Sequence, residues 1–230
     1  MTTTTFDRVY IWEAPVRLYH WVTVAAIITL ISTGLLIGHP VAILTSGDAS
    51  ASQWFGTVRF LHFTAAYLAI FALLIRVYWM FAGNRYARWS NFLPITPALF
   101  KPQFRQVLQV IKVDLFQVDV RPVRVKGHNA AAAWTYALFF LLTLFQAVTG
   151  LGLYAPMSTW WLPQLFTWVV PFMGGDAAVR LWHHTASWIF ILFVGIHLYL
   201  SLYHDVVEGA GEISSMVSGV KFVPAADRKA

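Results

Sequence analysis

The chain has 230 residues, of which 58% are hydrophobic and only 11% are charged, with a formal net charge of +6 and no cysteine. About 25% of the residues of an ordinary soluble domain are charged, so this composition excludes that class and indicates an integral membrane protein. The lack of cysteine excludes disulfides, thiolate metal sites, iron–sulfur clusters and covalently attached haem, and the basic residues form no patch that would suit a nucleic-acid partner.

Four apolar runs are long enough to cross a bilayer as helices, which takes about 17 to 25 residues. They predict spans at about residues 17–38, 58–82, 129–153 and 180–204. The basic residues lie mainly in the loop 83–127 and near the two termini, which places that side in the cytoplasm. We therefore predict an all-α integral membrane protein, a four-helix bundle of one domain over residues 1–230. Both termini, including the tail 205–230, are expected in the cytoplasm.

The first two predicted spans each carry one histidine near an end. His20 stands at the cytoplasmic end of the first span, and His62 stands at the outer end of the second. Ionisable side chains at membrane depth are costly and by default mark a functional site. Arg17 and Arg59 precede these histidines by three residues, a spacing that makes two side chains neighbours on a helix.

The cytoplasmic loop 83–127 is too long to be a simple connection. After three prolines it carries apolar residues at helical spacing, with Arg105 and Lys112 on the other face. This pattern predicts an amphipathic helix on the membrane surface. A solvated helix that covers the end of the bundle fits the pattern equally well.

The third predicted span carries no histidine. It begins next to His128 and Asn129, polar residues at the cytoplasmic face where a quinone head group would find partners. Near its other end, Gly150 and Gly152 permit the close approach of a neighbouring helix or a flat cofactor. The outer loop that follows, residues 154–179, is rich in aromatic residues, which suits either an interfacial belt or a protein docking surface.

The fourth predicted span carries four histidines, and helix geometry separates two of them. His183 and His197 are fourteen residues apart, which places them within about 40° of one face and about 21 Å apart along the axis. His184 points about 140° away from the face of His197 by the same arithmetic. The spacing therefore selects His183 and His197 as ligands and leaves His184 out.

The selected histidines form two pairs at two depths, His62 with His183 near the outer face and His20 with His197 near the cytoplasmic face. Low-spin haem iron takes one imidazole on each side, and b-type haem needs no cysteine. We therefore predict two haem b groups, between which electrons could cross the membrane. The histidines at positions 20, 62 and 183 follow an arginine by three residues: Arg17, Arg59 and Arg180.

These three arginines are candidate partners of the haem propionates, because arginine binds carboxylates bidentately. The alternative is that they are interfacial residues whose charged ends simply reach the water. The repetition of the spacing beside three separate histidines favours the propionate role.

Three stretches of this sequence resemble one known family: YIWEAPVRLYHW (residues 10–21), GHN (127–129) and SSMVSG (214–219). Together with the histidines at 183, 184 and 197, they are similar to the cytochrome b subunit of membrane-bound nickel-iron hydrogenases. The resemblance covers nearly the whole chain. The four-helix, two-haem plan is shared with the membrane subunits of formate dehydrogenase.

The resemblance implies a subunit that does not itself act on hydrogen. Such a subunit anchors the hydrogenase small and large subunits at the outer face of the inner membrane. It accepts electrons from the iron–sulfur clusters of the small subunit and reduces quinone near the cytoplasmic side. The ligands of the family match His20, His62, His183 and His197, and the formate dehydrogenase subunits suggest that Asn129 lies beside the quinone. The resemblance leaves open whether the complex forms a higher-order oligomer.

Two alternatives remain open at this stage. A cytochrome b subunit of another outer-face dehydrogenase, such as formate dehydrogenase, would share the same chemistry. A histidine-lined metal-ion transporter would belong to a different class. The four spans hold no carboxylate before Asp205, whereas paths for hard metal ions use oxygen ligands, so the transporter is the weaker alternative.

Overall fold

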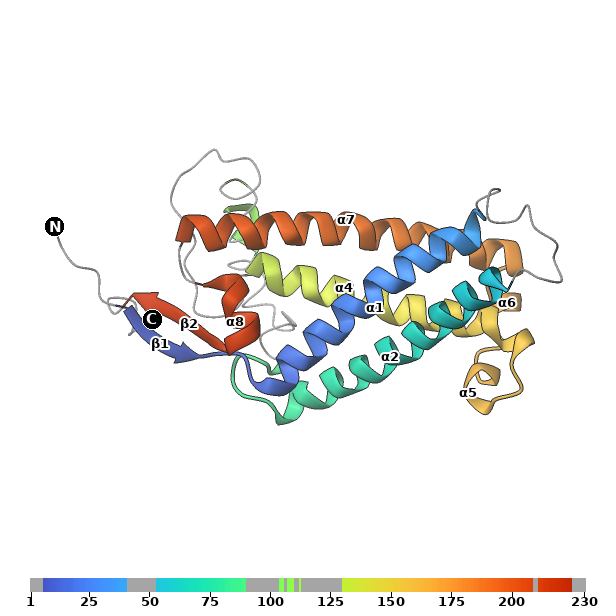
Figure 1. Ribbon diagram of the computed structural model, residues 1–230, viewed down its shortest axis with the longest axis horizontal. Helices are drawn as coiled ribbons and strands as arrows, with labels where there is room; N and C mark the ends of the chain where they lie inside the picture. Colours follow the sequence, from blue (N-terminus) through green and yellow to red (C-terminus); the bar gives the residue numbers. More distant parts are fainter. Residues whose placement is uncertain are drawn as a thin grey trace. The chain divides into compact units, whose positions relative to one another are not determined.

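A computed structural model describes residues 6–40, 53–89, 104–105, 107–109, 112, 130–208 and 211–224. Its described part is mostly helical, with four long helices (Figure 1). These are α1 (Ala14–Gly38), α2 (Trp54–Ala82), α4 (Ala130–Tyr154) and α7 (Asp176–Glu208). All four are long and apolar enough to cross a membrane. The predicted fold of four spanning helices is therefore confirmed.

The long helices extend beyond the predicted apolar spans at several ends. Helix α2 begins at Trp54 and α7 begins at Asp176, four residues before each predicted start. Polar residues can extend a helix beyond its apolar part. An acidic side chain such as that of Asp176 is favourable in the first turn, because the helix dipole is positive there. The apolar length of a run therefore marks the part that crosses the bilayer rather than the ends of the helix.

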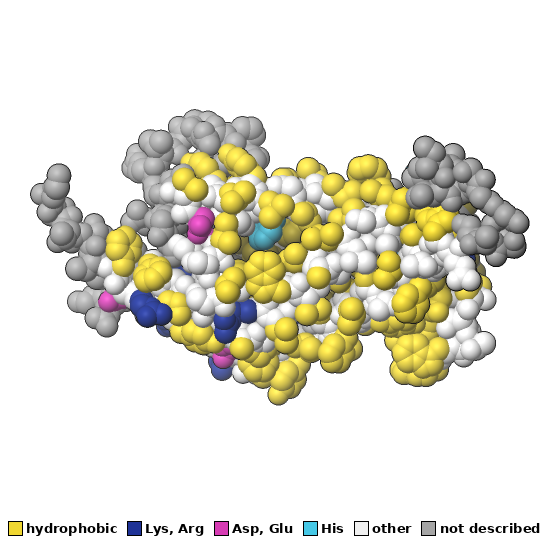
Figure 2. All heavy atoms as spheres, viewed as in Figure 1, with side chains coloured by type: hydrophobic (Ala, Val, Ile, Leu, Met, Phe, Trp, Pro, Cys, Tyr) yellow, Lys and Arg dark blue, Asp and Glu magenta, His cyan; other side chains and the backbone are white. Residues whose placement is uncertain are grey.

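The surfaces of the four long helices are strongly apolar. Between 11% and 17% of the residues in the apolar window of each helix are buried inside the protein. Large side chains such as Phe71, Leu141 and Leu192 are more than 60% exposed, and Figure 2 shows hydrophobic side chains over much of the visible face. Helical backbone satisfies its own hydrogen bonds, so lipid can cover such faces. The protein is a multi-pass membrane protein.

The chain divides into two compact units, each of which is described separately. Unit 1 comprises residues 1–20, 74–138 and 195–230, and unit 2 comprises residues 21–73 and 139–194.

Unit 1 joins the two ends of the described chain. Strands β1 (Phe6–Tyr10) and β2 (Val220–Pro224) pair antiparallel, with Tyr10 opposite Val220 (Figure 1). The short helix α8 (Glu212–Ser218) precedes β2. The sequence interpretation did not predict these strands, because two isolated five-residue strands give little periodic signal.

A small core lies where the N-terminal stretch meets α8 and the end of α2, a region that we call the junction of unit 1. It consists of Ile11, Trp12, Val16 and Ala87. The Trp12 indole donates a hydrogen bond to Ser215 at 3.2 Å. The Glu13 carboxylate accepts hydrogen bonds from the Trp79 indole and the Asn84 backbone, both at 2.8 Å. Residues of the N-terminal YIWE stretch thus contact both α8 and the end of α2.

The turn between α8 and β2 depends on Gly219, which has φ +84°. Its carbonyl oxygen accepts hydrogen bonds from the backbone N–H groups of Ile11 and Trp12 at 2.8 and 3.1 Å. A Cβ at this position would lie 2.6 Å from the Trp12 carbonyl oxygen. Only glycine fits this left-handed, closely packed position.

Unit 2 includes the folded connection between α4 and α7, which contains η4 (Ala155–Met157), α5 (Trp161–Gln164) and α6 (Val169–Phe172). Gly152 packs against Val169, because a Cβ there would lie 2.8 Å from the Val169 Cβ. The aromatic side chains of this connection are about half exposed or more: Trp160, Trp161, Trp168 and Phe172. Both of the roles predicted for this loop stay open.

We predict that Gly219→Ala opens the junction of unit 1. The left-handed conformation alone costs an alanine about 1 to 2 kcal/mol, which corresponds to an increase of about five- to thirty-fold in the open population. Lys221 is buried next to this turn, so trypsin cleavage at Lys221 in detergent-solubilised protein should accelerate by a similar factor. Gly56→Ala is the matched control, because a Cβ there meets no atom within 4 Å. Equal cleavage rates in both variants would contradict the role of Gly219.

Candidate functional site

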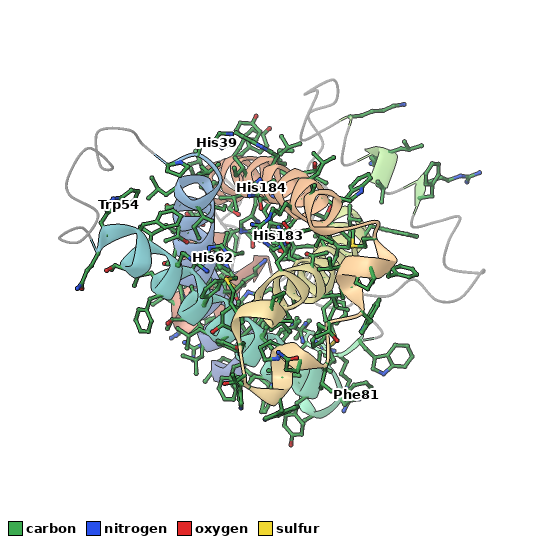
Figure 3. All side chains as sticks on the ribbon, turned by 90° about the vertical axis from the view of Figure 1, so that its right-hand side faces the viewer. His39, Trp54, His62, Phe81, His183 and His184 are labelled. Atoms are coloured by element: carbon green, nitrogen blue, oxygen red, sulfur yellow. The ribbon has the colours of Figure 1, made fainter. Side chains whose placement is uncertain are left out.

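Unit 2 contains a cavity of about 420 Å³ lined by the predicted site residues His62, His183, Arg59 and Arg180. Segments of α1, α2, α4 and α7 line it, and most of the other lining residues are apolar. Figure 3 shows His62 and His183 on the inner side of these helices. Cofactor pockets are of this size and are mostly apolar with a few polar groups.

His62 on α2 is held from the facing helix α1. Its Nδ1 atom lies 2.9 Å from the hydroxyl oxygen of Thr33. The next residue, Gly34, faces the same ring, and a Cβ there would lie 3.4 Å from His62 Cε1. The ring is therefore fixed at Nδ1 and lies close to a backbone that carries no side chain at this point.

His183 on α7 is held in the same way from α4. Its Nδ1 atom lies 2.8 Å from the hydroxyl oxygen of Thr149. A Cβ at Gly150 would lie 3.2 Å from His183 Cε1. Gln146, one turn earlier on α4, donates to the His183 carbonyl oxygen at 3.1 Å.

His184 also lines the cavity, but it has different neighbours. A Cβ at Gly38 of α1 would lie 2.7 Å from His184 Cε1, so this ring packs on the end of α1. Helix α7 is α-helical throughout residues 176–208, including Gly195. No bulge therefore changes the register between positions 183 and 197. The choice of His183 as the ligand stays a prediction.

Unit 1 brings together the second predicted pair, His20 on α1 and His197 on α7. The centres of their rings are 6.4 Å apart, and the ring planes are inclined by 59°. Two imidazoles bound to opposite sides of one metal ion, with bonds of about 2 Å, have ring centres about 6 Å apart. The spacing of this pair therefore fits axial ligation of one iron.

The three predicted arginines have other contacts in the structure. Arg180 forms an ion pair with Asp176 at 2.5 Å, and Arg59 contacts the Met157 sulfur at 2.5 Å. Arg17 donates to the carbonyl oxygen of Val217, in the last turn of α8. Only Arg59 and Arg180 line the cavity. Their contact with propionates stays a prediction.

Several predicted features fall wholly or partly outside the described residues. His128 and Asn129, the predicted quinone partners, lie outside them. Of the predicted amphipathic helix, residues 104–105 and 107–109 are described and are helical. The helix as a whole stays a prediction.

Sequence reasoning missed Thr33, Gly34 and Thr149 as parts of the site. Threonine in a membrane helix commonly bonds to the carbonyl oxygen four residues earlier, so its presence did not indicate a second role. The sequence marks Gly150 as a position of close approach, but it does not distinguish a neighbouring helix from a cofactor as the group that approaches.

The comparison with known proteins decides the class of this protein. Residues 11–219 match the family described as prokaryotic cytochrome b561. The chain belongs to this family. As a b-type cytochrome it holds haem b, which confirms the predicted type of cofactor, while the number of haem groups and their ligands stay predictions.

Three relatives illustrate the similarity, and all are named as probable Ni/Fe-hydrogenase B-type cytochrome subunits. The protein of Cupriavidus necator is 37% identical over 216 residues, which covers 92% of this chain and 86% of the relative. That of Azotobacter vinelandii is 37% identical over 214 residues, covering 92% and 87%. The hydrogenase 1 subunit of Escherichia coli K12 is 35% identical over 216 residues, covering 92% and 90%.

The residues of both pairs fit haem b. Each pair offers two imidazole nitrogens, and b-type haem can be held by such ligands without cysteine. In unit 2, Gly34 and Gly150 leave open the space that two side chains would fill beside His62 and His183. A flat macrocycle between the two rings requires such space.

We predict that His183→Ala removes the haem of this cavity and that His184→Ala does not. The Thr149 contact and the helical period both single out His183. The haem content of the two purified variants, measured against wild type by absorption, checks this. Loss of haem in His184→Ala alone would show that the wrong histidine was chosen.

Proposed function

We propose that this chain is the di-haem cytochrome b subunit of a membrane-bound nickel-iron hydrogenase. In this role it passes electrons from hydrogen oxidation at the outer face to the quinone pool. The observation that carries the proposal is the presence of two histidine pairs, one in each unit, in a b-type cytochrome. Similarity over 92% of the chain to subunits named for Ni/Fe-hydrogenases supports the choice of partner enzyme.

The proposed ligands are His62 and His183 for the outer haem and His20 and His197 for the inner haem. Haem b, when bound, accepts and donates single electrons. The four histidines would hold the haem groups through imidazole nitrogens. Thr33 and Thr149 would orient the rings of His62 and His183, and the apolar lining of the cavity would exclude water. These tasks set the stability and the potential of a haem site.

The remaining parts of the proposal concern orientation and partners. The basic loop and termini favour a cytoplasmic location for both ends of the chain in the inner membrane. The hydrogenase small and large subunits would then bind at the outer face, next to the His62–His183 site. Quinone would bind near His128 and Asn129 at the cytoplasmic side.

The test is to purify the cytochrome together with its hydrogenase partners and to measure haem, hydrogen-dependent reduction and quinone reduction. We expect two haem b per chain, both reduced by hydrogen, and loss of one in His20→Ala and in His197→Ala. Reduction by formate and copurification of a formate dehydrogenase would instead favour the alternative dehydrogenase. A stoichiometry of one haem, unchanged in His20→Ala, would remove the inner site.

We also predict that Arg59→Gln lowers the potential of the outer haem, because a nearby positive charge favours the reduced form of the iron. A redox titration of the purified cytochrome measures this shift. Arg85→Gln is the matched control, because Arg85 is exposed in unit 1 and stacks on Tyr86. If the two variants titrate like wild type, Arg59 is an interfacial residue without a role at the propionates.

A further inference from the structure

Unit 2 contains two copies of one sequence pattern. The first parts are TGLLIGHP at residues 33–40 and TGLGLYAP at residues 149–156. Each is followed in the next long helix by a second part, RFLHFTA at residues 59–65 and RLWHHTA at residues 180–186. In both copies a Thr-Gly pair near the end of one helix is thus followed by Arg-x-x-His-x-Thr-Ala near the start of another.

The two copies make the same contacts. The Thr33 hydroxyl lies 2.9 Å from His62 Nδ1, and the Thr149 hydroxyl lies 2.8 Å from His183 Nδ1. The glycine after each threonine faces Cε1 of the same ring. The alanines three residues after the histidines are both buried: Ala65 and Ala186. The cavity is therefore built from two equivalent helix pairs, each of which contributes one histidine and its threonine.

The direction of the two threonine–histidine hydrogen bonds is assigned from where each hydroxyl sends its hydrogen. A threonine hydroxyl has a single hydrogen. Thr33 donates it to the Thr29 carbonyl oxygen at 2.6 Å, and Thr149 donates it to the Phe145 carbonyl oxygen at 2.8 Å. The other backbone contacts of these hydroxyls, at 3.4 and 3.3 Å, also go to carbonyl oxygens, which can only accept.

With this hydrogen directed to the carbonyl oxygen, each hydroxyl oxygen accepts a hydrogen from the histidine, which assigns the Nδ1–H tautomer to His62 and His183. In a neutral imidazole the other nitrogen, Nε2, then has a free electron pair and can bind a metal. The threonines thus determine which nitrogen of each histidine is available.

We infer that Thr33 and Thr149 are a matched pair of positioning residues for the haem of this cavity. Each holds its histidine as the Nδ1–H tautomer and directs Nε2 to the iron; this inference rests on the proposed function of His62 and His183 as ligands. A hydrogen bond from Nδ1–H also makes the imidazole a stronger electron donor. Because both ligands are affected alike, the pair lowers the potential of this haem from both sides.

The ordinary role of such threonines is a bond within their own helix, with no further partner. That role accounts for Thr29, which bonds to the Ala25 carbonyl oxygen. It does not account for a histidine nitrogen within 2.9 Å at both positions of the repeated pattern. Thr29 therefore offers a control on the same helix.

The test uses the full-length cytochrome with Thr33→Val, Thr149→Val and both changes together, beside the corresponding serine variants. Valine keeps the shape of threonine and removes the hydroxyl, whereas serine keeps the hydroxyl. In the valine variants we expect about tenfold weaker retention of the outer haem, a higher potential and an altered ferric low-spin spectrum. The double variant should show the largest shift, and serine should restore the wild-type values.

The haem bound by His20 and His197 reports whether a variant is folded, and Thr29→Val and Thr185→Val are the matched controls. The Thr185 hydroxyl bonds within its own helix, to the Leu181 carbonyl oxygen at 2.8 Å. Valine variants with the potential and spectrum of wild type would overturn the inference, as would equal changes in the valine and serine variants. Absence of haem from the cavity in wild-type protein would overturn the proposed function instead.

Discussion

The arrangement of the helices around the cavity depends on the free-energy cost of burying imidazole rings among apolar side chains. An imidazole nitrogen without a partner in such surroundings costs several kcal/mol, so each nitrogen must be satisfied by another group. For His62 and His183, a threonine on the facing helix satisfies Nδ1. In the proposed haem site the second nitrogen of each ring would bind the iron, and this role would account for histidines at membrane depth.

This requirement also determines which helix surfaces approach each other closely. The hydroxyl of a threonine is short, so a bond of 2.8 or 2.9 Å to a histidine brings the two helices near together at that level. The glycines that follow, Gly34 and Gly150, permit this approach without a clash. Gly152 has a separate role, because it packs against Val169 in the connection after α4.

Much of the fold followed from the sequence, because long apolar runs without charge predict spanning helices directly. The four ligand candidates followed from the same periodicity, since α7 keeps an unbroken helical period between His183 and His197. The partners of those histidines could not be predicted. Whether Thr33 faces His62 or lipid depends on the rotation of α1 against α2, and apolar residues surround both helices. The β1–β2 pair was missed for a related reason, since its two short strands come from opposite ends of the sequence.

The pairing of β1 with β2 has a consequence for the order in which the protein assembles. The two strands are separated by more than 200 positions, and Ile11 and Trp12 bond to Gly219 across the same distance. During synthesis the first strand emerges long before its partner, so it stays unpaired while all four helices enter the bilayer. Closure of so long a loop is slow, and an unpaired strand edge invites association with other chains. Residues that follow the fourth long helix thus complete unit 1, and loss of β2 would leave an otherwise inserted protein with an exposed, unpaired first strand.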